Sequence, residues 1–541
     1  MKRKNVLFFL IDALRYDVVA DAELRPVLTP NIDRLINEGF VGKVIANAGT
    51  TQFVLPSLTT QTYPLDYGGY DTGIRHRKST FAEIFREAGY ATHLATSLDQ
   101  FCMAHDFERG FKHIRGLFSY SATLKRLIMR KLSYEIELWR KGQQTEAETV
   151  DVVREELGRL LRKFIALSQN APKLGFRHRH AERHNAWIAK RCEAELELLE
   201  REPETVLRKL ETIAPFYYFT TLGRRHADWR LQWVRVISAF VAYSRRCFGW
   251  LPFIFPQYAS FQYAAQDVVG DLPTRLAQEA KPWLAYVHLM DVHSYRIFRG
   301  VSDLFAKSAF LFRLRSLRRR GLADRPVLHD LSLMQVDRVL GRILDSLRHD
   351  GTLKDTIVLL TGDHGQYFPG YGPRGLQDVS FRTYREHLEV PLVIHGSDEP
   401  PMPCAGLLDS MSVPATLLAV ADLNGDPSFK GVSVFDGGKE VVIAENAGRG
   451  SADLARKDLY FNLTGYGHAM KVILRGSSLE VLALYDHADD PEECRDLKDI
   501  SEKQAITEAL LSVLHEERDE ILAERGVSIA QDKHAFKGSA L

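Results

Sequence analysis

The chain has 541 residues, of which 45% are hydrophobic and 26% are charged, and its 71 basic residues nearly balance its 70 acidic residues. These values are typical of a globular protein, so they exclude a disordered, collagenous or membrane-dominated chain. Because the formal net charge is only +1, no overall field attracts the chain to nucleic acid, and we expect no nucleic-acid partner. The five cysteines form no Cys-x-x-Cys pair, which argues against a disulfide framework and a cysteine zinc site.

The first apolar run, Val6 to Ile11, is too short for a signal peptide and lacks a small-residue cleavage site. Nowhere do about 18 apolar residues follow one another, as a membrane-spanning helix requires. The sequence therefore predicts a cytoplasmic protein without a signal peptide or transmembrane segment. It leaves the oligomeric state open.

The run at 5–11 (NVLFFLI) is continuously apolar, which is typical of a strand buried on both faces in a parallel sheet. Similar apolar runs predict further strands at 285–289, 356–360 and 391–394. Helical patterns lie between them, for example at 80–89, with Thr80 as the cap and Gly89 as the stop. Strands that alternate with helices predict an α/β fold with a doubly wound sheet.

Composition divides the chain into five segments. Residues 119–280 are rich in Arg, Lys, Glu and Leu at helical spacing, which predicts a helical insertion that forms a cap or lid. The α/β core would then comprise 1–118 and 281–435. A small C-terminal α+β subdomain is expected over 436–528, followed by a tail at 529–541.

Two further stretches have an unusual composition. The aromatic stretch at 247–263 contains two prolines, and buried packing is the favoured interpretation over a substrate-lining or membrane-dipping loop. The stretch at 304–321 predicts a basic amphipathic helix, either with a solvated face or with a site for anionic head groups. Together these stretches raise peripheral membrane contact as an alternative role.

Polar side chains follow three of the predicted strands. They are Asp12, Asp291 with His293, and Asp363 with His364. In a doubly wound sheet, function lies at the carboxyl ends of strands, and a buried carboxylate there is costly unless it is paired or bound to a metal. Asp12, Asp363 and His364 therefore predict a metal site, with a helix cap (Asp12) and a loop histidine (His364) as alternatives. Gly365 would let the backbone turn sharply after this pair.

Several segments, taken in order, resemble the sulfatase branch of the alkaline phosphatase superfamily. They include NVLFFLIDALRYD, TPNIDRLINEGF, TFAEIFREAGYATHLATS, AYVHLMDVHSY, TIVLLTGDHG and LYDHADDPEE. The resemblance covers about 1–115 and 280–500. It implies an alkaline-phosphatase-like fold and a metal-binding ester hydrolase or phosphotransferase.

The resemblance also bears on the nucleophile. Sulfatases carry Cys or Ser in a Cys/Ser-x-Pro-Ser-Arg motif and convert it to formylglycine, whereas the similar string here, VLPSL at 54–58, has Val54 in that place. In the family the nucleophile usually lies thirteen residues before the proline of a Tyr-Pro pair, and counting back from Pro64 gives Thr51.

Lipoteichoic acid synthases and phosphoethanolamine transferases of this superfamily use an unmodified threonine. In the latter the threonine lies five residues before a proline, as Thr51 does before Pro56. The resemblance thus implies Thr51 as the nucleophile and as a metal ligand, with Thr50 in reserve. A helix cap is the structural alternative for both threonines.

The ligand set differs from that of the formylglycine sulfatases. Those enzymes typically carry a second aspartate beside the first and an asparagine after the later one, where this chain has Ala13 and His364. An imidazole shifts the preference from calcium towards zinc or manganese. No Asp-x-x-x-His motif, which supplies a second metal in alkaline phosphatases, appears in the stretch around Asp291, His293, His329, Asp330 and Asp337, so we expect one divalent ion.

Four residues are candidates for binding the substrate. His293 resembles the family's substrate-contacting histidine, and it could also protonate the leaving group, although a core histidine is the alternative. His387 could play the same part. Arg382 lies near where sulfatases place an anion-binding lysine, and Arg374 competes with it, with a surface role as the default for each.

Taken together, the resemblance implies hydrolysis or transfer of a phosphate-type ester through a covalent Thr51 intermediate. The substrate would be an anionic ester, with a glycan or a lipid head group as options. A sulfuric ester hydrolase without formylglycine is one alternative. A catalytically silent relative that binds an anionic glycan or lipid is the other.

Overall fold

The structure, a computed structural model, describes residues 3–68, 73–98, 105–117, 132–169, 179–212, 218, 222–225, 236, 240, 263–295, 325–368, 371, 383–398, 405–446, 462–467, 469–475, 479–500 and 504–524. The basic stretch at 304–321, the aromatic stretch before Tyr263 and the tail lie outside the described residues. So do Arg374 and Arg382.

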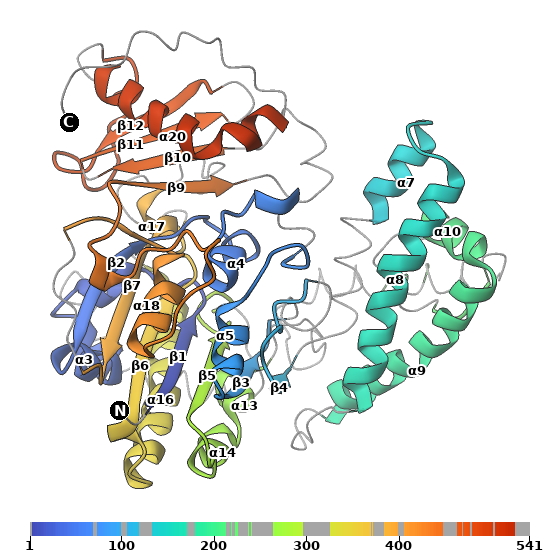
Figure 1. Ribbon diagram of the computed structural model, residues 1–541, viewed down its shortest axis with the longest axis horizontal. Helices are drawn as coiled ribbons and strands as arrows, with labels where there is room; N and C mark the ends of the chain where they lie inside the picture. The colour runs from blue at the N-terminus through green and yellow to red at the C-terminus, as the bar shows by residue number, and fades with distance from the viewer. Residues whose placement is uncertain are drawn as a thin grey trace.

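An eight-stranded sheet in the order β4-β3-β5-β1-β6-β7-β2-β8 forms the centre of the core (Figure 1). Its strands are β1 (Asn5–Ile11), β2 (Phe40–Ile45), β3 (Ala91–Thr96), β4 (His113–Gly116), β5 (Trp283–Leu289), β6 (Thr356–Gly362), β7 (Glu389–His395) and β8 (Leu408–Asp409). All four predicted strands are present, and the five strands from β4 to β6 run parallel to one another. This confirms the predicted α/β class.

Strand β7 departs from the prediction. The apolar run at 391–394 was expected to belong to a parallel sheet, but β7 pairs antiparallel with both β6 and β2. An apolar run reports burial on both faces and carries no information about strand direction. The prediction was therefore right about the strand and wrong about its orientation.

Helices cover both faces of the sheet, as a doubly wound fold requires. One layer contains α1 (Tyr16–Ala20), α2 (Arg25–Leu28), α3 (Pro30–Asn37), α13 (Ala265–Val269), α14 (Leu272–Ala277) and α16 (Val327–His349). The other contains α4 (Thr51–Thr60), α5 (Phe81–Glu87) and α18 (Ser412–Val420). Alternate side chains of β1 pack into the two layers. Thr80 caps α5 as predicted, and Glu83 completes a capping box.

Six described helices lie within 119–280, the range predicted for the insertion, and two of them, α13 and α14, pack on the core sheet. The other four are α7 (Ser133–Arg140), α8 (Glu146–Gln169), α9 (Arg179–Arg201) and α10 (Pro203–Thr212). Figure 1 shows them grouped to one side of the core. Helix α8 is tied to the core by ion pairs of Arg75 with Glu156 (2.8 Å) and of Lys163 with Glu108 (2.7 Å). The division into five segments and the role of cap or lid stay predictions.

A second, antiparallel sheet in the order β12-β11-β10-β9 follows the core. It comprises β9 (Val441–Asn446), β10 (Asn462–Gly467), β11 (Met470–Arg475) and β12 (Val481–Asp486), and α20 (Gln504–Glu524) packs on it. Arg518 of α20 pairs with Glu445 of β9 (2.5 Å) and with Asp66 of the core (2.7 Å). This is the predicted small α+β subdomain, held to the core by buried charge pairs.

The part of the chain that the structure describes contains no helix long and apolar enough to cross a membrane. The cytoplasmic location stays a prediction. The described residues also form four short helices: η1 (Asp66–Gly68), η6 (Leu353–Asp355), α17 (Arg385–Leu388) and η7 (Val434–Asp436).

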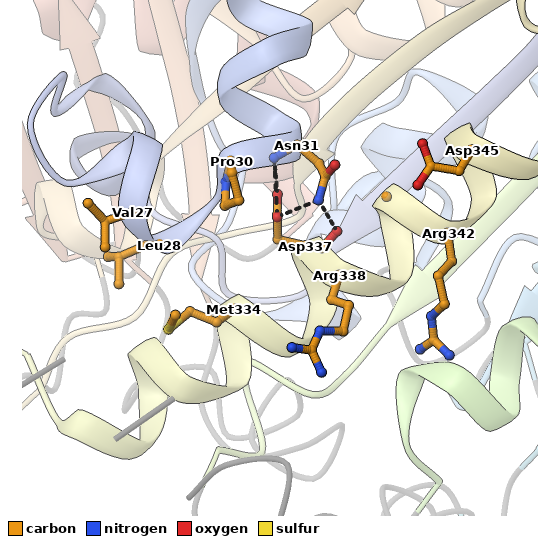
Figure 2. Close-up of a pocket in the computed structure, with 10 residues that line it drawn as sticks. Val27, Leu28, Pro30, Asn31, Met334, Asp337, Arg338, Arg342 and Asp345 are labelled. Atoms are coloured by element: carbon orange, nitrogen blue, oxygen red, sulfur yellow. Dashed lines mark hydrogen bonds between the residues drawn. The ribbon is translucent and has the colours of Figure 1, made fainter. Parts of the chain in front are cut away.

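A groove runs between α16 and the α2–α3 segment (Figure 2). At its floor the carboxylate of Asp337 accepts hydrogen bonds from the backbone N–H groups of Asn31 (3.2 Å) and Ile32 (3.0 Å), and so satisfies the start of α3. Burial nevertheless raises the pKa of Asp337 to about 6, with those hydrogen bonds as a partial offset. Asp337 therefore has a structural role, which is to hold the start of α3.

The Asp337→Asn variant should change how the free energy of unfolding depends on pH. The pKa of Asp337 in the folded state lies above 3.8, so the folded state binds this proton more tightly and the contribution of Asp337 to stability falls as pH rises from 4 to 7. The wild type should therefore lose up to about 3 kcal/mol relative to the variant across that window. Urea unfolding of both proteins at several pH values measures this loss of stability. A difference in unfolding free energy between the two proteins that stays constant with pH would contradict the prediction.

Candidate active site

Three adjacent strands at the centre of the sheet present polar side chains at or near their carboxyl ends. Asp12 follows β1 and Asp363 follows β6, while His288 is the sixth residue of β5. The backbone N–H of Asp12 donates to the Leu289 carbonyl (3.0 Å), so the chain continues the sheet where Asp12 begins the site. Asp12, Asp363 and His288 are each 0% exposed. The structure thus brings the two predicted carboxylates together at one buried edge.

Thr51 lies beside this edge, as the first residue of α4. Its Oγ1 is 3.0 Å from Oδ2 of Asp12, to which it donates a hydrogen bond, and 3.1 Å from Nε2 of His364. Thr50 is the residue that precedes the helix, and its side chain makes no capping hydrogen bond. The Thr51 hydroxyl therefore faces the predicted metal ligands and does not cap the helix.

The segment before Thr51 is held by the C-terminal subdomain. The Asn47 side-chain N–H donates to the Ile443 carbonyl of β9 (2.8 Å), and the backbone N–H of Gly49 donates to the side-chain oxygen of Asn446 (2.9 Å). These two hydrogen bonds to β9 hold the segment from which α4 starts. The C-terminal subdomain thereby holds the backbone that leads into Thr51.

Asp363 connects the two central strands. Its Oδ1 accepts the backbone N–H groups of Ala13 (3.1 Å) and His364 (2.8 Å). Ala13 adopts a φ of 63°, a left-handed conformation that costs an alanine about 1–2 kcal/mol. This strained residue lies directly after Asp12, where its N–H can reach Asp363.

The proton position on His364 follows from its neighbours. Nδ1 lies 2.6 Å from the Gly365 carbonyl, and because a carbonyl can only accept, Nδ1 carries the hydrogen. The lone pair of Nε2 then faces Thr51. Gly365 was expected to allow a sharp turn. Instead, the structure shows close packing, since a Cβ there would lie 2.1 Å from the Glu386 carbonyl oxygen.

The site has donor atoms that fit a divalent cation. Among the described residues, Oδ1 of Asp12 and Oδ2 of Asp363 are buried without a hydrogen-bond partner, an arrangement that is costly unless a cation binds them. They lie 3.8 Å and 3.6 Å from Nε2 of His364. Two ligands about 2.1 Å from one ion are roughly 3–3.4 Å apart, so Nε2 of His364 would have to move closer to each of these oxygens by a few tenths of an ångström.

The histidines around Asp12 also control its charge. Burial works against ionisation of the Asp12 carboxyl group, but His293, His288 and His364 outweigh it and hold the pKa of Asp12 well below 3.8. Asp12 is therefore an anion at neutral pH. That is the form that binds a metal.

His293 and His288 approach Asp12 from β5 and the residues after it. The ring of His293 stands nearly perpendicular to that of His364, with 6.0 Å between their centroids, and Asp12, His293 and His364 form one potential ligand group. Asp12, His288 and Asp363 form another. His288 is a site residue that was not predicted, although an imidazole within the apolar strand AYVHL was a signal.

His387 lies near this site. It belongs to α17, is buried, and its carbonyl accepts the N–H of Gly365 (2.8 Å), while its ring lies 6.3 Å from that of Tyr367. Arg374 and Arg382 fall outside the described residues. The structure thus brings together Thr51, Asp12, Asp363, His364 and His293.

Comparison with known proteins identifies the family. The Sulfatase family model matches residues 4–172 and 236–423, which is more than half of the chain. The protein belongs to the sulfatase family. Both matched segments contain site residues, Asp12 and Thr51 in the first and His293, Asp363 and His364 in the second. This sulfatase-family member is therefore an ester hydrolase of the alkaline phosphatase superfamily.

Solved structures share the fold of this sulfatase-family chain at low sequence identity. They include yidJ from Bacteroides fragilis (TM-score 0.57, 12% identity, 97% of this chain and 98% of that chain covered) and the phosphonate monoester hydrolase of Agrobacterium radiobacter (0.52, 16%, 96% and 96%). A third is Ps i-CgsB in complex with k-i-k-neocarrahexaose (0.52, 13%, 96% and 93%). Among curated proteins, no sequence matches the chain significantly.

Proposed function

We propose that this sulfatase-family enzyme cleaves a phosphate-type ester through a covalent intermediate on Thr51. The observation that carries the proposal is the place of the Thr51 hydroxyl, within hydrogen-bond distance of both Asp12 and His364. No other described hydroxyl in the 46–60 segment makes a hydrogen bond to either side chain. Thr51 is therefore the nucleophile that this geometry favours.

We propose Asp12, Thr51, Asp363 and His364 as the ligands of one divalent cation, zinc or manganese in preference to calcium. The mixture of two carboxylates, a hydroxyl and an imidazole supports that preference. When bound, such an ion would lower the pKa of the threonine hydroxyl and neutralise charge on the ester oxygens.

Each residue of the site then has its own part in the reaction. Asp12 accepts the Thr51 hydrogen bond and so turns an oxygen lone pair towards the substrate. The Thr51 hydroxyl passes its proton to Oδ2 of Asp12, and its oxygen attacks phosphorus as the bond to the departing alcohol breaks, which leaves a phosphothreonine. Thr51 takes this proton back when water breaks the bond between phosphorus and the threonine oxygen. His293 would protonate the departing oxygen and later accept a proton from the water that releases phosphate.

Two observations favour phosphorus esters over sulfate esters. Val54 stands in the place of the residue that sulfatases convert to formylglycine, and His364 stands in the place of their asparagine. The phosphonate monoester hydrolase shows that the same fold serves phosphorus esters. Because Ps i-CgsB with the same fold binds k-i-k-neocarrahexaose, we propose an anionic glycan ester as one substrate class and a lipid head group as the other.

A paired assay should show faster turnover of phosphorus esters. We expect kcat/KM for an aryl phosphate or an aryl phosphodiester to exceed that for the matching aryl sulfate by at least about tenfold, which is about 1.4 kcal/mol of transition-state stabilisation. Acid quenching during turnover should leave one phosphoryl group on the peptide that contains Thr51, as detected by mass spectrometry. Faster sulfate turnover without a labelled peptide would support the sulfuric ester hydrolase, and no turnover of either would support the silent relative.

A further inference from the structure

Two histidines and a glutamate meet at the edge of the core sheet, outside the Asp12 site. His93 of β3 and His113 of β4 are register partners on neighbouring parallel strands, so their side chains lie on the same face. Their rings stack with 4.6 Å between centroids and 23° between planes. Oε1 of Glu279, which follows α14, lies 3.0 Å from Nε2 of His93.

These residues come from the two ends of the segment that contains the helical insertion. Strand β4 lies just before this segment begins, whereas Glu279 lies just before β5, where the chain returns to the sheet. Arg115 of β4 already spans the same gap, because it donates to the carbonyls of Val268 (2.9 Å) and Asp267 (3.0 Å) of α13. We call the region formed by β4, α13 and Glu279 the neck of the insertion. It joins chain segments that are distant in sequence.

We propose that His93, His113 and Glu279 bind a divalent transition-metal ion of the Zn²⁺ or Ni²⁺ type, which fastens the neck of the insertion. The three residues offer one ligand atom each, and these atoms lie within 4.8 Å of one another. Ligands of one zinc ion are about 3–3.5 Å apart, so the ligand atoms must move closer by about 1 Å. His113 is exposed and the Glu279 side chain is 24% exposed, which leaves both free to make this adjustment.

The chemistry of the three side chains suits such an ion. Two imidazoles and one carboxylate favour zinc, nickel or copper over magnesium or calcium. Glu279 supplies one negative charge. Arg275 opposes the cation, but its guanidinium pairs with Asp271 at 2.8 Å.

The proposed ion is distinct from the one at the Asp12 site. His93 pairs in register with Ala285 of β5, three residues before His288. Three residues of strand correspond to about 10 Å, so one ion cannot serve both clusters. The two sites share no ligand, and loss of one leaves the other intact.

The test is a Zn²⁺ titration of the full-length, chelator-treated protein by isothermal calorimetry. We expect the wild type to bind one ion more than His113→Ala, and Glu279→Gln to bind the additional ion at least about tenfold more weakly. His349→Ala is the matched control, because His349 is an exposed histidine at the end of α16 and belongs to no ligand group among the described residues. The test compares the number of ions bound by the wild type and by each variant, and it does not use the total number bound. Its result is therefore independent of whether the Asp12 site binds a metal.

Thermal unfolding provides a second readout. Zn²⁺ should raise the Tm of the wild type by more than that of His113→Ala, while the two proteins should unfold at the same Tm in excess chelator. Equal stoichiometry and affinity in the wild type and His113→Ala would overturn the proposal. So would loss of one ion in His349→Ala.

Discussion

The Thr51→Ala variant should lose at least about 10³-fold in kcat/KM towards an aryl phosphate or phosphodiester, because it removes the oxygen that forms the covalent bond. Asp12, Asp363 and His364 remain, so metal content should stay near that of the wild type. Thr51 is 8% exposed, and the substitution removes only two side-chain heavy atoms, Oγ1 and Cγ2, so the fold should persist. Steady-state kinetics together with metal analysis of the same preparation measure both quantities.

Two control variants sharpen this prediction. Thr51→Ser keeps the hydroxyl and should retain far more activity than Thr51→Ala. Thr50→Ala removes the neighbouring hydroxyl, which has no hydrogen-bond partner among the described residues, and should leave activity nearly unchanged. An inactive Thr50→Ala beside an active Thr51→Ala would transfer the role of nucleophile to Thr50. Full activity in both would remove the covalent mechanism.

The Asp363→Asn variant should bind the catalytic metal at least about 100-fold more weakly and lose activity in parallel. An asparagine can still accept the N–H groups of Ala13 and His364, so the strand ends stay joined, but the negative charge that a cation needs is gone. Metal affinity by competition with a chelator, measured beside kcat, checks the result. Excess metal should restore part of the activity.

Asp291→Asn is the matched control for the charge. Asp291 is another buried aspartate after a central strand; its Oδ1 accepts the Ala265 N–H (3.1 Å), and it belongs to neither potential ligand group that contains Asp12. Its substitution should leave metal affinity within about threefold of the wild type. If both variants bound metal as tightly as the wild type, Asp363 would not be a ligand.

Much of the core could be predicted because its signals are local. An apolar run such as 5–11 marks a buried strand wherever it occurs, and Thr80 and Glu83 form their capping box within four residues. Polar side chains after such strands must gather at one edge of the sheet, which is why Asp12 and Asp363 could be paired from the sequence.

The remaining features depend on contacts between distant residues. The direction of β7, the role of Gly365 and the place of His288 against Asp12 all arise from packing that leaves no periodic pattern. Thr51 could be singled out only through a resemblance to known enzymes. The residues next to Thr51 in the sequence would also suit a helix cap. Only the contacts of Thr51 with Asp12 and His364 distinguish a nucleophile from a cap.

The hydrogen bonds from Asn47 and Gly49 to β9 have a consequence for the timing of maturation. A chain still on the ribosome can pair β1 with β5 and β6 and so bring Asp12 and Asp363 together early. The contacts that hold the segment before Thr51 do not exist until residue 446 has been made and has left the exit tunnel. With Thr51 as the proposed nucleophile, catalytic competence is therefore among the last properties that the growing polypeptide acquires.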